Sequence, residues 1–189
     1  MTVLGVVLAA GAGERFRASG GVGPKQLARV DGQPLVVRAA AVARAAGLDE
    51  VVVVAGAVDL SDSGLPVEVL DNPRWREGIA TSLQVAVRRA EAAGHDALVV
   101  GLADQPGVTI DAWRAVAVAS DEPPIAVATY GGRRGNPVRL ARSVWPELPD
   151  TGDEGARSLI LRRPALVQAV PCDGRNDDID TLEDLDRWS

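Results

Sequence analysis

The sequence predicts a single-domain α/β protein, a three-layer αβα sandwich built around a mostly parallel, Rossmann-like sheet. Short apolar runs rich in β-branched residues alternate along the chain with longer helical segments. Such runs are typical of strands that are buried on both faces by helices. The chain of 189 residues suits one domain over residues 1–189, because no repeat, low-complexity tract or linker divides it.

The apolar pattern and the positions of proline and glycine predict the individual strands and helices. Strands are expected at residues 3–8, 50–55, 66–70, 97–102 and 125–129. Helices are expected at residues 34–46, 81–93, 110–119, 157–162 and 182–188. Pro34 suits a first helical turn, while Gly47 and Gly94 suit helix ends. The stretch 130–149 is the least regular and has room for an inserted antiparallel element over the sheet.

Composition excludes several classes of protein. The net charge of −6 argues against a general nucleic-acid binder, whose affinity comes from many cationic phosphate contacts. Cys172 is the only cysteine, which rules out an intrachain disulfide and a cysteine-rich zinc site. The apolar run at residues 3–12 is too short to span a bilayer, so we expect a cytoplasmic protein without a membrane partner. His95, the only histidine, is expected on the surface without a role.

A glycine-rich, basic loop follows the first strand. Gly11 and Gly13 permit close backbone approach, so that successive N–H groups can face an anion. Arg15 and Lys25 add positive charge to the same loop. The loop lacks the G-K-[ST] ending of a Walker A motif and the third glycine of a dinucleotide fingerprint. Its residues suit a triphosphate, although a glycine pair alone also fits an ordinary sharp turn with solvated basic residues.

The segments LAAGAGERF and GPKQL together resemble the opening of the MobA-like NTP transferases. Within that family the chain is most similar to the molybdenum cofactor cytidylyltransferases. The resemblance implies a sheet of the nucleotide-diphospho-sugar and nucleotidyltransferase type. It also implies that Arg15 and Lys25 hold phosphates and stabilise charge on the α-phosphorus. The nucleotide-binding backbone would be that of Leu8, Ala9, Ala10, Gly11 and Gly13.

Two acidic segments are candidate metal ligands. Asp104, in LADQP, follows an expected strand, where a carboxylate can bind Mg²⁺ between phosphates. A turn aspartate before a proline is the alternative, but the family has a metal-binding aspartate at this place. The C-terminal NDDIDTLEDLDRW resembles the segment that completes the family's metal site, and either Asp178 or Asp180 fits. Thr181 or Asp180 can also cap the last helix.

Three further loops match family motifs. In WREGIATSL, the resemblance places Gly78 and Ser82 against the nucleobase and ribose, although Thr81 or Ser82 can equally cap a helix. The segments RRGNP and GDEGAR resemble loops that face the acceptor of the cytidylyltransferases. The implied acceptor-binding residues are Asn136, Asp153 and Arg157, with the arginine suited to a phosphate, although GDEGAR also fits an ordinary helix entry.

The resemblance implies transfer of a nucleoside monophosphate from an NTP to a phosphomonoester, with release of pyrophosphate. LAAG, DQP and GDEGAR favour CTP and a molybdopterin acceptor, whose product a molybdoenzyme would receive. Three alternatives stay open. These are a GTP-dependent guanylyltransferase, a methylerythritol-phosphate cytidylyltransferase, which shares PKQL, and a molybdenum cofactor carrier without catalytic activity. Arg15, Lys25 and Asp104 together favour catalysis over carriage.

Overall fold

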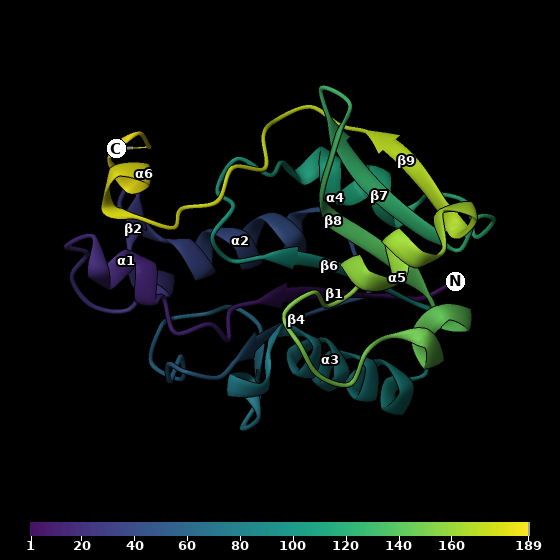
Figure 1. Ribbon diagram of the computed structural model, residues 1–189, viewed down its shortest axis with the longest axis horizontal. Coiled ribbons are helices and arrows are strands. Elements are labelled where there is room, and N and C mark those ends of the chain that lie inside the picture. The colour runs from purple at the N-terminus through teal and green to yellow at the C-terminus, as the bar shows by residue number, and fades with distance from the viewer. Residues whose placement is uncertain (189) are drawn as a thin grey trace.

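One seven-stranded sheet forms the centre of the protein, in the order β5-β4-β1-β6-β8-β7-β9 (Figure 1). The computed structural model describes residues 1–188. All neighbouring strands pair in parallel except β8, which runs antiparallel to both β6 and β7. The strands are β1 (Val3–Leu8), β4 (Glu50–Ala55), β5 (Glu68–Asp71), β6 (Ala97–Leu102), β7 (Ile125–Tyr130), β8 (Arg133–Ala141) and β9 (Val167–Pro171), and a separate ribbon pairs β2 (Arg29–Val30) with β3 (Gln33–Pro34).

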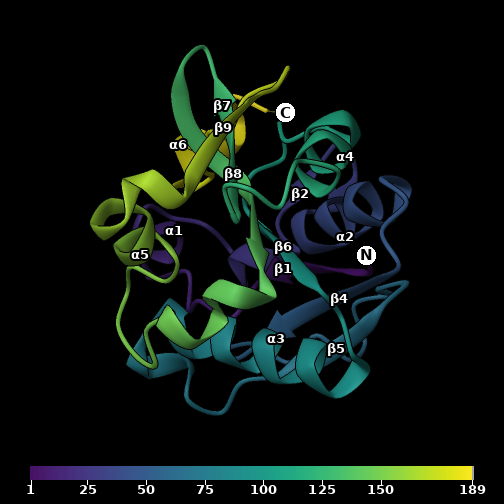
Figure 2. The ribbon, with the colours of Figure 1, turned by 90° about the vertical axis from the view of Figure 1, so that its right-hand side faces the viewer.

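Helices cover both faces of the sheet, as the view in Figure 2 shows. One layer holds α2 (Leu35–Ala45) and α4 (Ile110–Ala117), and the other holds α3 (Ile79–Ala93) and α5 (Arg157–Arg162). Two short helices, α1 (Glu14–Ala18) and α6 (Leu182–Asp186), lie together at one end of the molecule although they come from opposite ends of the chain (Figure 1). The predicted three-layer α/β fold is confirmed.

Strand β1 shows why the sheet is buried on both sides. Its six residues are all buried, and alternate side chains enter different apolar clusters. Val3 and Val7 pack on the α2 side, whereas Leu4 and Val6 pack on the α3 side. A continuous apolar run, rather than an alternating one, is therefore the pattern that a central parallel strand requires.

The structure shifts some predicted boundaries. The third strand covers Glu68–Asp71 rather than 66–70, and the helix expected at 81–93 begins at Ile79. The irregular stretch 130–149 does contain an antiparallel element, but β8 lies within the sheet between β6 and β7. Buried Val138 and Leu140 in its second half explain why it enters the sheet rather than lying over it. Strand β9 was not predicted, because it is short and includes Gln168 and Pro171.

The expectation of a surface histidine is wrong. His95 is 6% exposed and lies directly after α3, with its Nε2 3.0 Å from Glu50 Oε2. Glu50 also accepts hydrogen bonds from Arg89, so that it links β4 to the end of α3. Hydrogen bonds from His95 and Arg89 lower the pKa of Glu50, outweighing the opposite effect of its burial. His95 therefore has a structural position beneath the helix end.

The C-terminal segment closes over the start of the chain. Ile179 is fully buried beside Val30 and Leu35, which fixes the segment against the α2 end of the sheet. Thr181 caps α6 in a capping box with Asp184, so the cap falls on Thr181 rather than Asp180. The segment is thus anchored at the point where Asp178 and Asp180 flank Ile179. Among residues 1–188, no helix has the length and apolar character needed to cross a membrane.

Candidate active site

A cavity of about 620 Å³ lies at the carboxyl ends of β1 and β6. This is the edge at which parallel α/β sheets bind ligands. We call it the first cavity. It is lined by the glycine-rich loop, the loop before α3 and the C-terminal segment, with Leu8, Ala9, Ala10, Gly11, Gly13, Arg15, Lys25, Gly78, Ser82, Asp104 and Asp180 among its walls. All the residues predicted to bind nucleotide therefore share one cavity.

The glycine-rich loop has the backbone shape that its sequence predicts. Gly13 has a φ of 67° and precedes α1. A Cβ on Gly13 would stand 2.9 Å from the Cβ of Lys25, so glycine lets the two segments of the motif touch. Buried Gln26 holds the loop by donating from Nε2 to the carbonyl oxygens of Ala9 and Gly11, at 2.9 and 2.5 Å. These two hydrogen bonds satisfy loop carbonyls and hold the glycine-rich loop in one shape.

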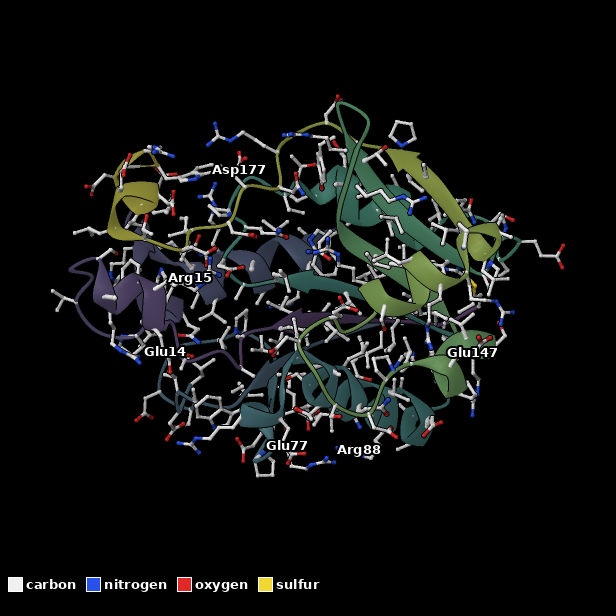
Figure 3. The ribbon with its side chains drawn as sticks, viewed as in Figure 1. Glu14, Arg15, Glu77, Arg88, Glu147 and Asp177 are labelled. Atoms are coloured by element: carbon white, nitrogen blue, oxygen red, sulfur yellow. The ribbon has the colours of Figure 1, made fainter. Side chains whose placement is uncertain are left out.

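Lys25 lies at the centre of the charged groups. Its Nζ donates to Asp104 Oδ2 at 2.6 Å and to Asp180 Oδ1 at 3.1 Å. Arg15 pairs with the other oxygen of Asp180 at 2.9 Å. The Arg15 side chain is 77% exposed and reaches Asp180 from the solvent side. The Lys25 side chain is 14% exposed and reaches the same carboxylate from the protein interior. Figure 3 labels Arg15 on α1 and Asp177 on the C-terminal segment that passes near it.

The carboxylates keep Lys25 charged. Burial alone would lower the pKa of Lys25, but the negative charges and hydrogen bonds of Asp104 and Asp180 raise it above its ordinary value. A permanently cationic amine in a half-open cavity is suited to phosphate oxygens. With Arg15 beside it, the site can balance the charge of a polyphosphate.

Asp104 and Asp180 also fit a divalent cation. Their oxygens already converge on one positive group, Lys25 Nζ, and Asp104 Oδ1 is buried without a hydrogen-bond partner among the described residues. Hard divalent cations prefer such carboxylate oxygens. Within residues 1–188, however, no three histidine, cysteine or acidic side chains are grouped so as to hold a metal by themselves. Phosphate oxygens and water would therefore complete the coordination.

The structure separates the two aspartates that the sequence left open. Asp180 faces Lys25, whereas Asp178 Oδ1 accepts a hydrogen bond from Gln105 Nε2 at 2.8 Å. Burial, followed by the charge of Asp104, raises the pKa of Asp178 above its usual range. Of the two candidates, only Asp180 therefore shares a cation with Asp104.

The opposite wall of the first cavity comes from the loop before α3. Gly78 has a φ of 102°, and a Cβ there would come within 2.3 Å of the backbone of Gly152. The carbonyl of Gly152 accepts from Ala80 N, which ties the GDEGAR loop to the start of α3. Ser82 is buried and receives a hydrogen bond from Asn72 Nδ2. Neither Thr81 nor Ser82 caps α3, since Gly78 occupies the N-cap without a side-chain cap.

A second cavity of about 580 Å³ adjoins the first. Leu8, Leu102, Ile79 and Asp153 line both, so the two share a wall at the ends of β1 and β6. The three residues predicted to bind the acceptor all line the second cavity, and they are Asn136, Asp153 and Arg157. The geometry thus provides two adjoining binding volumes with the charged cluster in one of them.

Comparison with known proteins identifies the family. The family described as "MobA-like NTP transferase domain" matches residues 5–168. The chain belongs to the MobA-like NTP transferase family. A relative from Paenarthrobacter nicotinovorans, named nicotine blue oxidoreductase, is 32% identical over 98% of this chain and 95% of its own length.

Solved structures of similar proteins agree with the fold. The crystal structure of Rv0371c from Mycobacterium tuberculosis H37Rv is 30% identical, covers 99% of this chain and 97% of its own, and gives a TM-score of 0.80. A manganese complex of Rv0371c is 29% identical, covers 100% of this chain and 98% of its own, with a TM-score of 0.76. Membership of this family makes the chain a nucleotidyltransferase. The substrates of such an enzyme are a nucleoside triphosphate and a phosphorylated acceptor.

Sequence reasoning missed several residues of this NTP transferase's cavities. Gln26 and Gln105 are buried at 4% and 6% exposure, and they fix the glycine-rich loop and Asp178 respectively. Both stand beside residues that the sequence did single out, in PKQL and DQP. Arg76, which lies over the ring of Trp75 at 4.3 Å in the first cavity, had no motif to identify it.

Proposed function

We propose that the protein transfers the cytidylyl group of CTP to the phosphate of a molybdopterin-type acceptor and releases pyrophosphate. The observation that carries the proposal is the shared wall of the two cavities. The triphosphate would lie against Lys25 and Arg15 in the first cavity, and the acceptor would lie in the second. Its phosphate would then approach the α-phosphorus across Leu8 and Leu102.

The reaction needs positioning and charge neutralisation more than covalent help. An oxygen of the acceptor phosphate forms a bond to the α-phosphorus, and the bond from that phosphorus to the bridging oxygen breaks. Pyrophosphate leaves with the electron pair. No general base is needed, because the acceptor phosphate is already ionised at neutral pH. Lys25 and Arg15 would stabilise the negative charge that gathers on the departing oxygens.

Asp104 and Asp180 would hold Mg²⁺ once a triphosphate draws Lys25 away from them. When bound, the ion neutralises charge on the phosphate oxygens. The manganese complex of Rv0371c supports a divalent ion in the family. In the same proposal Gly78 and Ser82 border the nucleoside, while Asn136, Asp153 and Arg157 border the acceptor. A molybdoenzyme would receive the product.

The test is pyrophosphate release with Mg²⁺ and molybdenum cofactor, comparing CTP, GTP, ATP and UTP. Release with CTP alone is expected. Release with GTP instead would keep the reaction class and reject the interpretation of LAAG. Asp104→Ala should lower turnover at least a hundredfold while acceptor binding persists. Binding of molybdenum cofactor without pyrophosphate release from any nucleotide would favour a molybdenum cofactor carrier without catalytic activity.

A second candidate follows from the relative named nicotine blue oxidoreductase, which matches 98% of this chain. An oxidation–reduction needs an electron donor, so the test is consumption of NADH or NADPH in the presence of nicotine blue. Under the main proposal the protein consumes neither. Consumption that survives Lys25→Met would separate this activity from the triphosphate site.

A further inference from the structure

Asp178 is a carboxylate in the second cavity that the transfer reaction does not use. It forms no hydrogen bond or ion pair with Lys25, whose partners are Asp104 and Asp180. The residue instead faces the volume bordered by Asn136, while buried Ile179 separates it along the chain from Asp180. Its position therefore requires a different account from that of the metal-binding pair.

A chain of hydrogen bonds fixes the orientation of Asp178. Tyr130 donates its hydroxyl to the carbonyl of Asn136 at 2.7 Å, and Asn136 Nδ2 donates to Gln105 Oε1 at 3.1 Å. Gln105 Nε2 then donates to Asp178 Oδ1 at 2.8 Å and to the carbonyl of Asn176 at 3.1 Å. Both ends of the buried Gln105 amide are thus occupied. The amide cannot turn its oxygen toward Asp178 without losing three hydrogen bonds.

This arrangement leaves acceptor capacity directed at a ligand. Across residues 1–188, no hydrogen bond or ion pair joins Asp178 Oδ2 to another group. Oδ1 has a second lone pair beyond the one that Gln105 uses. A carboxylate held in this way can accept two parallel N–H bonds, which are stronger and more directional than neutral contacts.

Aliphatic side chains form about half of the lining of the second cavity, beside the charged side chains of Arg134, Asp153, Glu154 and Arg157. Leu83, Val100, Val127 and Val138 are all buried at its walls. A ligand with hydroxyl groups around its whole rim would leave unpaired those hydroxyls that meet these aliphatic side chains, which is costly. A flat ring with polar groups on one edge would place its faces on the walls and that edge on Asp178.

We propose that Asp178 determines acceptor specificity by accepting hydrogen bonds from adjacent N–H groups on a planar nitrogen heterocycle. Gln105 and Asn136 are positioning residues that hold the carboxylate as an acceptor. The inference rests on the proposed function in one respect, the assignment of the second cavity to the acceptor. Asp178 would be the residue that recognises the acceptor, and the N–H edge of the heterocycle would be the part recognised.

Two fluorescent heterocycles test the inference by direct binding, without turnover. Pterin presents an amino group beside a ring N–H, and in lumazine a carbonyl replaces that amino group. Wild-type protein should bind pterin about tenfold or more tightly than lumazine, the scale of one charged hydrogen bond. Asp178→Asn should abolish this preference, because an amide can donate to the carbonyl of lumazine. Gln105→Met should reduce the preference while Mn²⁺–CTP binding stays unchanged.

The matched control is Asp177→Asn. Asp177 is the adjacent carboxylate, but it is 67% exposed and pairs with Arg175, so its loss should leave the preference intact. An unchanged preference in Asp178→Asn would overturn the inference, as would a wild-type protein that binds neither compound. Loss of Mn²⁺–CTP binding in Asp178→Asn would instead make Asp178 a metal ligand and equally overturn it. CTP-dependent pyrophosphate release is measured separately, so failure of the proposed function remains distinguishable.

Discussion

Lys25 Nζ lies 2.6 Å from Asp104 Oδ2, although 79 residues separate the two along the chain. Asp180 approaches the same ammonium at 3.1 Å. In this state the lysine occupies the place between two carboxylates where a divalent ion would be held. We therefore expect nucleotide and metal binding to be coupled, since a triphosphate that attracted the lysine would also free the carboxylates.

Replacement of Lys25 by methionine should strengthen metal binding at the site and weaken nucleotide binding. Without the ammonium, two neighbouring carboxylates remain uncompensated, so Mn²⁺ should bind at least tenfold more tightly in the absence of nucleotide. CTP should bind about tenfold more weakly, because a phosphate contact is lost. Titration with Mn²⁺, followed by electron paramagnetic resonance, measures the first effect, and calorimetry with CTP measures the second.

Arg15→Met is the matched control for that experiment. Arg15 also pairs with Asp180, but its side chain is 77% exposed, and exposed ion pairs contribute little. Its loss should change nucleotide-free Mn²⁺ affinity by no more than about threefold. Equal effects from the two substitutions would show that general charge, rather than the position of Lys25, controls the metal.

Gly78→Ala should disturb both cavities through one backbone contact. The added Cβ would come within 2.3 Å of the carbonyl carbon and oxygen of Gly152, and neither backbone atom can turn aside. We expect a loss of about 3 kcal/mol in the free energy of unfolding, from left-handed strain and displacement of the GDEGAR loop. Urea unfolding measures it, and CTP binding should weaken in parallel.

Gly94→Ala separates strain from collision. Gly94 has a φ of 75°, yet a Cβ there would meet nothing within 4 Å. Its substitution should cost only the conformational strain, about 1 kcal/mol, and leave CTP binding unchanged. If the two variants lose equal stability, the contact between Gly78 and Gly152 does not carry the effect.

The buried arginine of β8 leads to an asymmetric prediction. Arg139 is fully buried and pairs with Asp121, which is 61% exposed. Asp121→Ala leaves a buried cation with weaker partners and should cost about 2 kcal/mol of unfolding free energy. Arg139→Met should cost less than about 1 kcal/mol, because Asp121 can be hydrated and methionine fills the space. Thermal unfolding compares the two, and a larger loss for Arg139→Met would contradict the prediction.

Protonation of Glu50 should lower the stability of the folded protein at acid pH. Its hydrogen bonds to His95 and Arg89 lower its pKa in the folded protein below the ordinary value of 4.5. The stabilisation is therefore complete above that ordinary value and is lost as the pH falls through the lower, folded value. Glu50→Gln should be about 2 kcal/mol less stable than wild type at neutral pH, and the difference should shrink in acid.

Urea titrations at neutral and acid pH check this dependence. Glu77→Gln serves as the control, because Glu77 pairs with Arg74 on the surface, where both side chains are about half exposed. Its stability should match wild type at both pH values. A difference between Glu50→Gln and wild type that grows in acid would show that Glu50 is destabilising when ionised.

Local pattern determined the regular parts of the fold. Strands β1, β4 and β6 and helix α5 were predicted with the boundaries that the structure has, because each is a short run with a consistent apolar pattern and clear ends. The place of β8 was not predictable in this way. An antiparallel strand between β6 and β7 is selected by pairing with residues far along the chain, and no local signal specifies such a partner.

The sequence by itself determined the family, the parallel strands β1, β4 and β6, and the glycine-rich loop. The strands are continuous apolar runs, and LAAGAGERF with GPKQL encodes a backbone shape and a charge within one short segment. Only the tertiary structure separated Asp178 from Asp180 and placed His95 beneath a helix end. The two aspartates stand two residues apart with the same chemistry, so their different surroundings depend on what folds against them. Gln105 lies beside Asp178 and Lys25 beside Asp180, and these neighbours stand 73 and 155 positions away along the chain.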